Sequence, residues 1–451
     1  MDVVVVGGSD AGISAALRVR EYDPTAGVTM LVADTYPNFS ICGIPYHLSG
    51  EVPDWRDLAH RTLAEIEATG VQVRVNHIAT AVDAVRKVVT AATDDGPVEF
   101  SYDRLVIGTG AEPLRPPIIG LDRLGPADGV HLLHTIDETR RLDDDLRRRG
   151  AQRVVIIGAG YIGIEMAEAL TNRGIGVTVL ERLGNVLPRT LDHELADDIT
   201  AELEAHGVEV RRGTTVTEVR RDDGGVCVVA DDAKWTADTV LVVSGVTPNS
   251  TVAATSGVLV NDHGTIAVDR QMRTNLPDVW AAGDCVHTHH ALLTEPTYLP
   301  LGTTAHKQGR VAGENAAGGH KEFAGIVGTQ VVRVFDRVVA ATGLRDLEAA
   351  LAGYQPLTVQ TVADDHKRYY PGATPIQIRL TGDRNSGRLL GAQLVGTLGA
   401  EIAKRVDTYA VALQQGLTVE QLLDLDLSYT PPLGSPWDAI QLAAQAWLAV
   451  R

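Results

Sequence analysis

A single cysteine lies between two glycine-rich segments, and these three features carry most of the chemistry that the sequence indicates. Cys42 occurs in the segment NFSICGIPY, residues 38–46. The glycine-rich segments are VVVVGGSDAG at residues 3–12 and RVVIIGAGYIG at residues 153–163. In each, an apolar strand pattern runs into a glycine turn and then a helical pattern, the context that a dinucleotide-binding fingerprint requires. Two nucleotide sites and a nearby thiol predict electron transfer from a nicotinamide through a flavin to sulfur.

The second glycine segment has all three glycines of a dinucleotide-binding turn. Gly158 permits the tight turn, Gly160 lets a pyrophosphate approach the backbone, and Gly163 allows the helix to pack closely on the strand. The phosphates would lie at the N-terminus of that helix, where unpaired N–H groups and the helix dipole favour an anion. We therefore predict a dinucleotide site here, with Tyr161 and Ile162 among its contacts.

An acidic residue ends the next strand pattern and bears on which nicotinamide cofactor binds. Glu181 stands about 20 residues beyond the glycines, where a carboxylate accepts hydrogen bonds from ribose hydroxyls. A carboxylate suits a free 2′-hydroxyl better than a 2′-phosphate, which favours NADH. Arg182 beside it could bind a phosphate, so NADPH stays open as an alternative. Gly245, at the end of a later apolar strand pattern, is a further predicted cofactor contact.

The first glycine segment is less regular, because Ser9 stands at the middle glycine position. Its surroundings nevertheless predict an FAD site. Asp34 ends the second strand pattern and suits a ribose, while Asp284 would accept from the ribitol. The predicted FAD contacts are Gly7, Ser9, Ala11, Gly12, Asp34, Ser40, Thr109, Gly110, Asp284 and Thr303.

These residues resemble the FAD-dependent pyridine nucleotide–disulfide oxidoreductases, and the resemblance runs nearly end to end. Within that family the chain is most similar to the single-cysteine branch, which comprises coenzyme A disulfide reductases, NADH oxidases, NADH peroxidases and persulfide reductases. The segments that carry the resemblance are residues 38–46, 158–165, 278–284, 299–304, 366–372 and 429–432. It implies a homodimer in which Tyr370 and Tyr429 reach the active site of the partner subunit.

The resemblance also implies the fold: an α/β protein with two Rossmann-like nucleotide-binding domains, the first discontinuous, followed by an α+β dimerisation domain. We expect the FAD domain at residues 1–112 and 246–324, the NAD(P)H domain at 113–245 and the dimerisation domain at 325–451. Within the last, alternating apolar residues over 331–339 and 375–380 predict strands, and helical spacing over 400–415 and 436–450 predicts helices.

Cys42 is the predicted redox group, and it must be a thiolate to act as a nucleophile. The residues after it could begin a helix, whose N-terminus would lower its pKa. The thiolate would attack a small disulfide or persulfide and form a mixed disulfide. Peroxide or oxygen could instead take it through a sulfenic acid, so an NADH oxidase or peroxidase is the alternative enzyme. A flavin-binding redox sensor or interaction protein is the alternative of another class.

The chain departs from each subgroup of the family at one position or more. His47 stands where the dithiol branch has its second cysteine, which makes a dithiol cycle improbable. Asp10 stands near the place where oxidases and peroxidases carry a histidine, and its carboxylate would repel a thiolate. Coenzyme A reductases tend to place adjacent arginines at the end of the first helix, whereas this chain offers Arg18 and Arg20. A CoA-linked acceptor therefore stays one possibility among several.

Composition excludes some partners. The net charge of −18 over 451 residues argues against nucleic acid and anionic membranes, which reward basic surfaces. No apolar run reaches the ~20 residues of a membrane-spanning helix, and Met1 leads straight into a strand pattern, so we expect a cytoplasmic protein. We predict no metal site, interpreting His287, His289 and His290 as a surface loop, and the acidic run at 143–145 as a solvated helix face.

Overall fold

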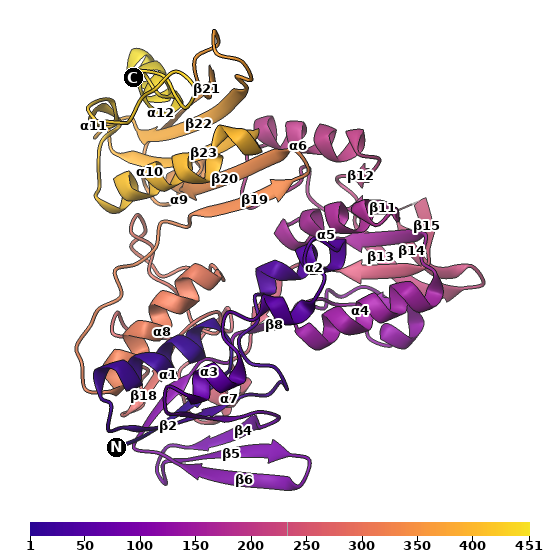
Figure 1. Ribbon diagram of the computed structural model, residues 1–451, viewed down its shortest axis with the longest axis vertical. Helices are drawn as coiled ribbons and strands as arrows, with labels where there is room; N and C mark the ends of the chain where they lie inside the picture. The colour runs from indigo at the N-terminus through magenta and orange to yellow at the C-terminus, as the bar shows by residue number, and fades with distance from the viewer. Residues whose placement is uncertain (232) are drawn as a thin grey trace.

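The computed structural model describes residues 1–231 and 233–451, which fold into three lobes (Figure 1). The first lobe holds the N-terminus, and the third lobe, at the opposite end of the view, holds the C-terminus. Two lobes are built on parallel sheets and the third on an antiparallel sheet covered by helices. The predicted fold class is therefore confirmed.

The first lobe is built on a parallel sheet in which a late segment of the chain pairs with early ones. Its strand order is β18-β7-β1-β2-β3. The strands are β1 (Asp2–Val6), β2 (Gly27–Leu31), β3 (Val71–Arg74), β7 (Arg104–Ile107) and β18 (Val279–Ala281). Because β18 pairs with β7, the chain returns to this sheet after building the second lobe. The predicted discontinuity of the first domain is confirmed.

Two long helices of the first lobe pack with their backbones in close contact. They are α1 (Asp10–Tyr22) and α8 (Gly302–Ala316). A Cβ on Gly309 would lie 2.2 Å from the carbonyl oxygen of Ala11, and one on Gly313 would lie 2.3 Å from that of Ala15. Only glycine lets the two backbones come this near. The lobe also contains α3 (Leu63–Glu67), α7 (Thr251–Thr255) and the antiparallel strands β4 (Ile78–Asp83), β5 (Val88–Thr93) and β6 (Gly96–Ser101).

The second lobe repeats the strand–turn–helix pattern. Its parallel sheet has the order β12-β11-β10-β16-β9. The strands are β9 (Val130–His131), β10 (Arg153–Ile157), β11 (Gly176–Leu180), β12 (Glu209–Arg211) and β16 (Thr239–Val242). The helices are α4 (Ile136–Arg149), α5 (Tyr161–Asn172) and α6 (His193–Ala205), and an antiparallel sheet is formed by β13 (Val216–Asp222), β14 (Gly225–Ala230) and β15 (Ala233–Ala237).

The two chain crossings between the first and second lobes pair with each other. Strand β8 (Ala111–Pro113) lies on the way out and pairs antiparallel with β17 (Val246–Pro248) on the way back. This two-stranded connection supports the boundaries that we propose near residues 112 and 245.

The third lobe is an antiparallel sheet of order β19-β20-β23-β22-β21 with helices packed on it. Its strands are β19 (Gln330–Val334), β20 (Arg337–Gly343), β21 (Pro356–Asp364), β22 (Pro375–Asp383) and β23 (Leu389–Thr397), and its helices are α9 (Asp346–Leu351), α10 (Ile402–Gln414), α11 (Val419–Leu423) and α12 (Ala439–Val450). The apolar alternation predicted over 331–339 spans two strands, because Phe335 adopts a positive φ of 50° and turns the chain into a hairpin.

One hydrophobic core joins the helix after Cys42 to the other two lobes. Helix α2 (Ile44–Ser49) contributes the buried residues Ile44 and Leu48. They belong to the same cluster of buried side chains as Met166 of α5 and Val332 of β19. The segment that carries the thiol is therefore packed between lobes rather than on the sheet of its own lobe.

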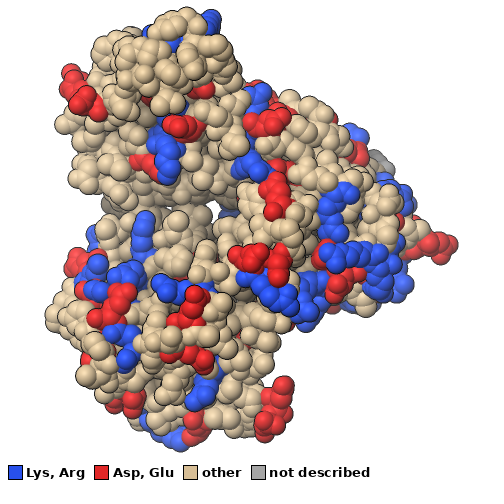
Figure 2. Space-filling model, in the orientation of Figure 1, with Lys and Arg blue, Asp and Glu red and all other residues tan. Residues whose placement is uncertain are grey.

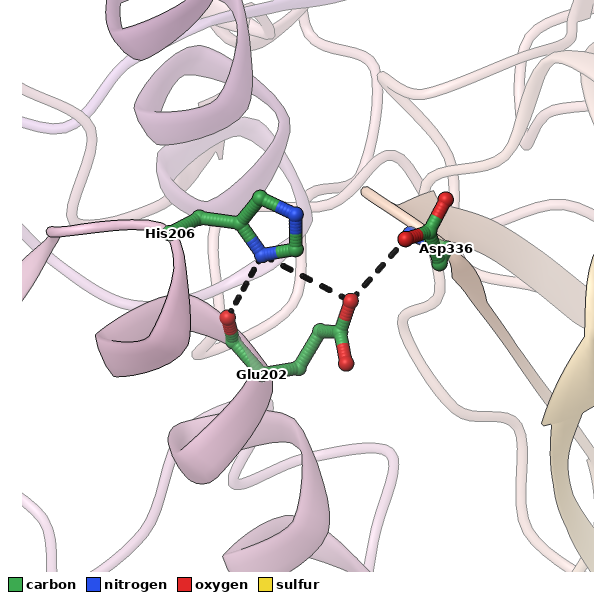
Figure 3. A group of neighbouring side chains, drawn as sticks. All are labelled: Glu202, His206 and Asp336. Carbon is green, nitrogen blue, oxygen red and sulfur yellow. Dashed lines mark hydrogen bonds and ion pairs between the residues drawn. The ribbon is translucent and has the colours of Figure 1, made fainter.

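A polar contact also joins the second lobe to the hairpin of the third (Figure 3). The backbone N–H of Asp336 donates to the carboxylate of Glu202 at 3.3 Å, and Arg337 pairs with the same carboxylate at 3.3 Å. The ring of His206 stacks on Phe335 with centroids 3.9 Å apart. Glu202, His206 and Asp336 are close enough to hold a metal ion, but the carboxylate of Glu202 already has three protein partners, since Nδ1 of His206 lies 3.6 Å from it. We interpret the three residues as a structural contact between the second and third lobes.

The acidic run of α4 is only in part the solvated face that the sequence predicts, since Asp144 alone of the three is exposed. Asp143 and Asp145 are buried. Asp143 pairs with Arg173 at 2.7 Å, and Asp145 pairs with His131 at 3.0 Å and Arg149 at 2.8 Å. Burial raises the pKa of Asp145, but its hydrogen bonds to His131 and to arginines outweigh this, and the pKa lies below its ordinary value. The prediction was wrong for these two carboxylates because the neighbouring arginines fold back on them and allow them to be buried.

The histidine cluster is also less exposed than predicted. His290 is buried, while His287 and His289 are half-buried. The Nε2 atom of His287 lies 2.8 Å from the carbonyl oxygen of Val268, so this ring is engaged by the backbone. His290 forms a β-bridge with Ile326, so the segment is part of the packed structure and not a free surface loop.

The face of the molecule in Figure 2 carries no large field of one charge. Lys and Arg side chains are interspersed with Asp and Glu over the first two lobes, and the third lobe is largely uncharged on this face. Among the described residues, no helix is long and apolar enough to cross a bilayer.

The contact between α1 and α8 predicts the effect of one added methyl group. In an isolated helix alanine is more stable than glycine by about 1 kcal/mol. At Gly313 the overlap with the Ala15 carbonyl should reverse this, so Gly313→Ala should lower the free energy of unfolding by about 2 kcal/mol. Gly184→Ala is the matched control, since a Cβ there meets nothing within 4 Å. Denaturant unfolding checks both; equal stability of the two variants would contradict the close contact.

Candidate active site

The first glycine turn is shaped by close backbone contacts. Gly7 has a φ of 120°, and a Cβ on it would lie 2.0 Å from the Gly108 carbonyl oxygen. A Cβ on Gly12 would lie 2.1 Å from the Gly7 carbonyl oxygen. Ser9 is the N-cap residue of α1, and the buried Ala11 lies in the first turn of that helix. The turn therefore brings the N-terminus of α1 against the end of β1, as predicted.

The second glycine turn has the same geometry. Gly158 has a φ of 112°, and a Cβ on Gly163 would lie 2.0 Å from the Gly158 carbonyl oxygen. Gly160 is the N-cap residue of α5, and a Cβ there would meet nothing within 4 Å. The Glu181 carboxylate accepts from the N–H of Ala159 at 2.8 Å, which places it beside this turn. Ile162 is half-buried in the first turn of α5.

Open space lies where the predicted cofactors would pass. Gly110 and Gly245 have positive φ values of 69° and 127°, and, like Gly160, neither would place a Cβ within 4 Å of another atom. Gly7, Gly12 and Gly163 thus pack against backbone, whereas Gly110, Gly160 and Gly245 border open space. A dinucleotide at each turn fits this arrangement, because extended phosphates need both close backbone and room.

The remaining predicted FAD contacts lie around the first turn. Asp284 is half-buried, and its pKa is raised to about 6 by burial first and by Asp10 second. Asp34 is half-buried and accepts from the N–H of Thr35 at 2.6 Å. Thr303 is exposed at the start of α8, and the hydroxyl of Thr109 donates to the Asn249 carbonyl. Ser40 is the N-cap residue of the short 3₁₀ turn at Ile41–Gly43. Their contacts with FAD stay predictions.

Cys42 lies in that 3₁₀ turn, immediately before α2. It is exposed, whereas Cys227 and Cys285 are buried. Cys285 instead donates weakly to the carbonyl oxygen of Ala282 at 3.4 Å. Of the free cysteines, Cys42 alone is therefore accessible to a substrate.

The environment of Cys42 differs from the expected one in its electrostatics. A helix N-terminus does follow the thiol, but the pKa of Cys42 is raised, first by partial desolvation and then by the carboxylates of Glu165, Asp10 and Asp284. The expectation of a lowered pKa is thus wrong for the protein groups taken alone, because partial desolvation first and the three carboxylates second raise the pKa. The predicted repulsion between Asp10 and the thiolate is present.

Sequence reasoning missed an acidic group behind the thiol helix. Glu165 lines a small cavity together with Tyr46 and Arg333. Burial, and then Glu168, raises the pKa of Glu165 to about 7, while Arg333 acts in the opposite direction. Because Glu165 lies four residues after Tyr161 on α5, one turn along the same face, its position could have been found from helical spacing.

Arg333 of β19 contacts residues of the first and second lobes next to this cavity. Its guanidinium pairs with Glu51 at 2.7 Å and with Glu168 at 2.8 Å, and it lies 5.1 Å from the ring centroid of Tyr46. Residues from all three lobes thus meet around one charge. No motif in the sequence marks Arg333, since it occurs in an ordinary strand pattern.

Tyr161 is held by polar contacts at the base of α5. Its hydroxyl donates to the Gln330 side chain and accepts from Thr190, whose oxygen is 3.0 Å away. Burial is the main cause that raises the pKa of Tyr161. The phenol therefore stays neutral and bridges the second and third lobes in this structure.

The tyrosines of the third lobe are exposed together, and the structure adds one to the predicted pair. Tyr369, Tyr370 and Tyr429 are 74%, 45% and 44% exposed. A hydrogen bond to Tyr429 is the main cause that raises the pKa of Tyr369. The backbone N–H of Lys367 also donates to the carbonyl of Pro431 at 3.2 Å, which joins the two tyrosine segments. Sequence reasoning chose Tyr370, whereas Tyr369 is the neighbour of Tyr429.

The arginines at the end of α1 are already engaged. Arg18 pairs with Glu314 of α8 at 2.6 Å and with Glu21 at 3.0 Å. Arg20 donates to the backbone carbonyls of Pro24 and Ala26 at 2.6 Å. Arg20 therefore has a structural role. Arg18 could bind a phosphate only if its ion pair with Glu314 opened.

With this geometry in place, comparison with known proteins decides the family. A family described as pyridine nucleotide-disulphide oxidoreductase matches residues 1–309, and its dimerisation domain matches residues 329–439. The chain belongs to this family. It is an oxidoreductase of the type that uses FAD and NAD(P)H, as predicted.

Similar proteins match over nearly the whole chain. The NAD(P)H sulfur oxidoreductase (CoA-dependent) of Pyrococcus abyssi is 33% identical, over 98% of this chain and 97% of that protein. An NADH oxidase of Methanocaldococcus jannaschii is 30% identical, over 99% of this chain and 98% of that protein. The structure of an NAD-dependent persulfide reductase from A. fulgidus is 37% identical with a TM-score of 0.95, and the match covers 100% of this chain and 84% of that one.

The raised pKa of Glu165 predicts a pH-dependent effect on Cys42. Above about pH 7 the carboxylate is charged and disfavours the thiolate, whereas below it the group is protonated and resembles glutamine. Glu165→Gln should therefore speed alkylation of Cys42 by roughly threefold at pH 8.5 and leave it unchanged at pH 6. Iodoacetamide labelling followed by mass spectrometry measures this, with the exposed Glu204→Gln as control. An equal effect at both pH values would contradict the prediction.

Proposed function

We propose that the protein passes electrons from NADH through FAD to Cys42, which reduces a low-molecular-weight disulfide or persulfide. The observation that carries the proposal is Cys42 itself: an exposed thiol on the segment between the two nucleotide turns, in a chain whose other cysteines are buried. Similar proteins named for sulfur and persulfide reduction support it.

The chemistry of the thiol follows from one nucleophilic exchange. The Cys42 thiolate attacks one sulfur of the substrate, the substrate S–S bond breaks, and the leaving thiolate takes a proton. Bound FAD would supply the two-electron link between NADH and this sulfur. Two electrons then break the mixed disulfide, which releases the second thiol and restores the Cys42 thiolate. His47 stands in the position of a resolving cysteine. The cycle therefore uses no second protein thiol, and Cys42 forms its mixed disulfide with the substrate sulfur.

The proposed donor is NADH. The Glu181 carboxylate lies beside the second glycine turn and is bound by the N–H groups of Ala159 and Leu183 at 2.8 Å each. A fixed negative charge at this point would repel a 2′-phosphate and accept from a 2′-hydroxyl. This supports NADH over NADPH.

We include a CoA-linked acceptor in the proposal because of the names of similar proteins. The arginines at the end of α1 do not add support. The P. abyssi protein is named as CoA-dependent. In this chain Arg20 binds backbone carbonyls and Arg18 pairs with Glu314. Recognition of CoA phosphates would therefore need the Arg18–Glu314 pair to open.

The alternative enzyme is an NADH oxidase, which the M. jannaschii relative supports by its name. Oxygen or peroxide would then take the electrons at the same sites. Nothing in the comparisons supports a redox sensor, because the similar proteins are named as enzymes.

The dimerisation domain indicates a homodimer. We propose that Tyr429 and Tyr369 or Tyr370 complete the active site of the partner subunit. Their exposure in one chain, together with that of Leu433 at 69% and Trp437 at 50%, supports an interface there. We also propose a cytoplasmic location, which three free cysteines fit.

Replacing Cys42 tests the function. Cys42→Ser should abolish reduction of disulfides and persulfides, while NADH still bleaches the flavin absorbance at the normal rate. The acceptor is found by measuring NADH and NADPH consumption with oxygen, peroxide, CoA disulfide and CoA persulfide. Cys227→Ser is the matched control and should keep full turnover. Unchanged disulfide turnover in Cys42→Ser would rule the proposal out, and a preference for oxygen would select the oxidase.

The tyrosine pair is tested by removing hydroxyl groups. If the phenol of Tyr429 donates a proton to the leaving thiolate, Tyr429→Phe should lower kcat with the preferred acceptor by about 10²-fold. Tyr369→Phe should lower it as well, because its hydroxyl is bonded to that of Tyr429, whereas the exposed Tyr22→Phe is a control. Light scattering should show a dimer for every variant. Full activity of Tyr429→Phe would make it a packing residue, and a loss only in Tyr370→Phe would restore the original choice.

A further inference from the structure

Arg405 is a buried arginine of the third lobe, and its side chain joins three separate stretches of chain. It lies on α10, and 9% of its side chain is exposed. All three guanidinium nitrogens donate hydrogen bonds. A buried charge costs free energy unless it is paired and hydrogen-bonded in this way. The acceptors of Arg405 therefore show which parts of the lobe it holds.

One acceptor lies at the base of the loop at residues 366–373, which contains two of the exposed tyrosines; we call it the tyrosine loop. Nη2 of Arg405 donates to the carbonyl oxygen of Asp365 at 2.8 Å. Asp365 closes this loop, because its N–H donates to the carbonyl of Thr374 at 2.9 Å and its carboxylate accepts from the N–H of Thr374 at 2.9 Å. Arg405 thus holds the base of the tyrosine loop against α10.

A second acceptor lies at the end of residues 424–438, which connect α11 to α12 and which we call the Tyr429 segment. The Asp438 carboxylate pairs with Nη2 of Arg405 at 3.0 Å and with Nε at 3.3 Å. The same carboxylate accepts from the N–H of Ile440 at 3.0 Å and so caps α12. Arg405 therefore fixes the C-terminal end of the Tyr429 segment.

Two further contacts complete the arrangement. Nη1 of Arg405 donates to the carbonyl of Ala400, in the 3₁₀ turn just before α10, which fixes the guanidinium relative to its own helix. The N–H of Lys367 donates to the carbonyl of Pro431 at 3.2 Å, which joins the tyrosine loop directly to the Tyr429 segment. One guanidinium and one backbone hydrogen bond thus set the two stretches in a fixed relation to each other.

We propose that Arg405 is a positioning residue for the active site of the partner subunit. It holds the tyrosine loop and the Tyr429 segment in the arrangement that the substrate bound to the partner meets. Arg405 is itself buried within its lobe and acts only through these tyrosines. The proposal rests on the proposed role of the tyrosines in the partner's site. Loss of Arg405 should therefore impair Cys42 of the partner subunit and spare the Cys42 of its own chain.

Removing the guanidinium should slow turnover and leave the flavin unaffected. The acceptor is whichever of CoA disulfide, CoA persulfide, peroxide and oxygen the parent protein reduces fastest. Arg405→Met should lower kcat with it about tenfold, since a small displacement of a catalytic group costs rate. NADH should still bleach the flavin absorbance at the parent rate.

A second variant guards against a folding defect. An Asp438 charge left alone in the interior would destabilise the lobe, so Arg405→Met is also combined with Asp438→Asn. Asparagine can still cap α12, and the double variant should show the same loss of kcat. Arg451→Met is the matched control, because this exposed arginine binds the backbone carbonyls of Arg384 and Asn385 in the same lobe. It should keep full turnover.

A mixed dimer separates action on the partner subunit from a general defect. One subunit carries Arg405→Met with its Cys42 intact, and the other carries Cys42→Ser with its Arg405 intact. Two different affinity tags allow the mixed dimer to be purified. Its one intact thiol meets tyrosines that an intact Arg405 holds. Because the other of the two equivalent sites is dead, the mixed dimer should have about half the activity of the parent dimer.

Each result decides the proposal. A mixed dimer no more active than the Arg405→Met homodimer would overturn it, because the defect would then lie in the subunit that carries the substitution. Full kcat in both Arg405 variants would overturn it as well, and so would loss of the dimer or of bound flavin in both, measured by light scattering and absorbance. Failure of the proposed function appears separately, as full turnover in the Cys42→Ser homodimer.

Discussion

The helix that follows Cys42 is held by a hydrophobic core that three lobes build together, and the candidate site depends on this arrangement. Ile44 and Leu48 of α2 share that core with α5 of the second lobe and with β19 of the third. Arg333 adds a polar tie at its edge through Glu51 and Glu168. The thiol therefore stands where the two nucleotide turns and the C-terminal lobe converge.

Electrostatics at this point work against the thiolate. The carboxylates of Glu165, Asp10 and Asp284 all act to raise the pKa of Cys42, in addition to its partial desolvation. Burial raises the pKa of Glu165 to about 7, so the charge of this group near the sulfur changes close to neutral pH.

The sequence predicted the parts of the fold that repeat along the chain, and missed the contacts that join distant parts. Glycine turns and apolar runs gave both parallel sheets and the discontinuous first domain, because their signals are local. The burial of Asp143 and Asp145 could not be foreseen, since it depends on which arginines fold back on them. Arg333 was missed for the same reason, because its partners Glu51 and Glu168 lie far from it along the chain. Cys42 was predicted as the redox group because its flanking residues are distinctive, and the structure adds that it is the exposed cysteine.

The shared core also has a consequence for how the protein is made. Helix α2 occurs early in the chain, but Val332, Val339 and Val395, which share its core, are among the later residues to be synthesised. Contacts of such long sequence separation form slowly. During synthesis the segment with Cys42 has no completed surface to pack on. The sulfur of Cys42 thus obtains its final surroundings only when most of the chain has left the ribosome, and a chain truncated before these valines would lack part of the core that holds α2.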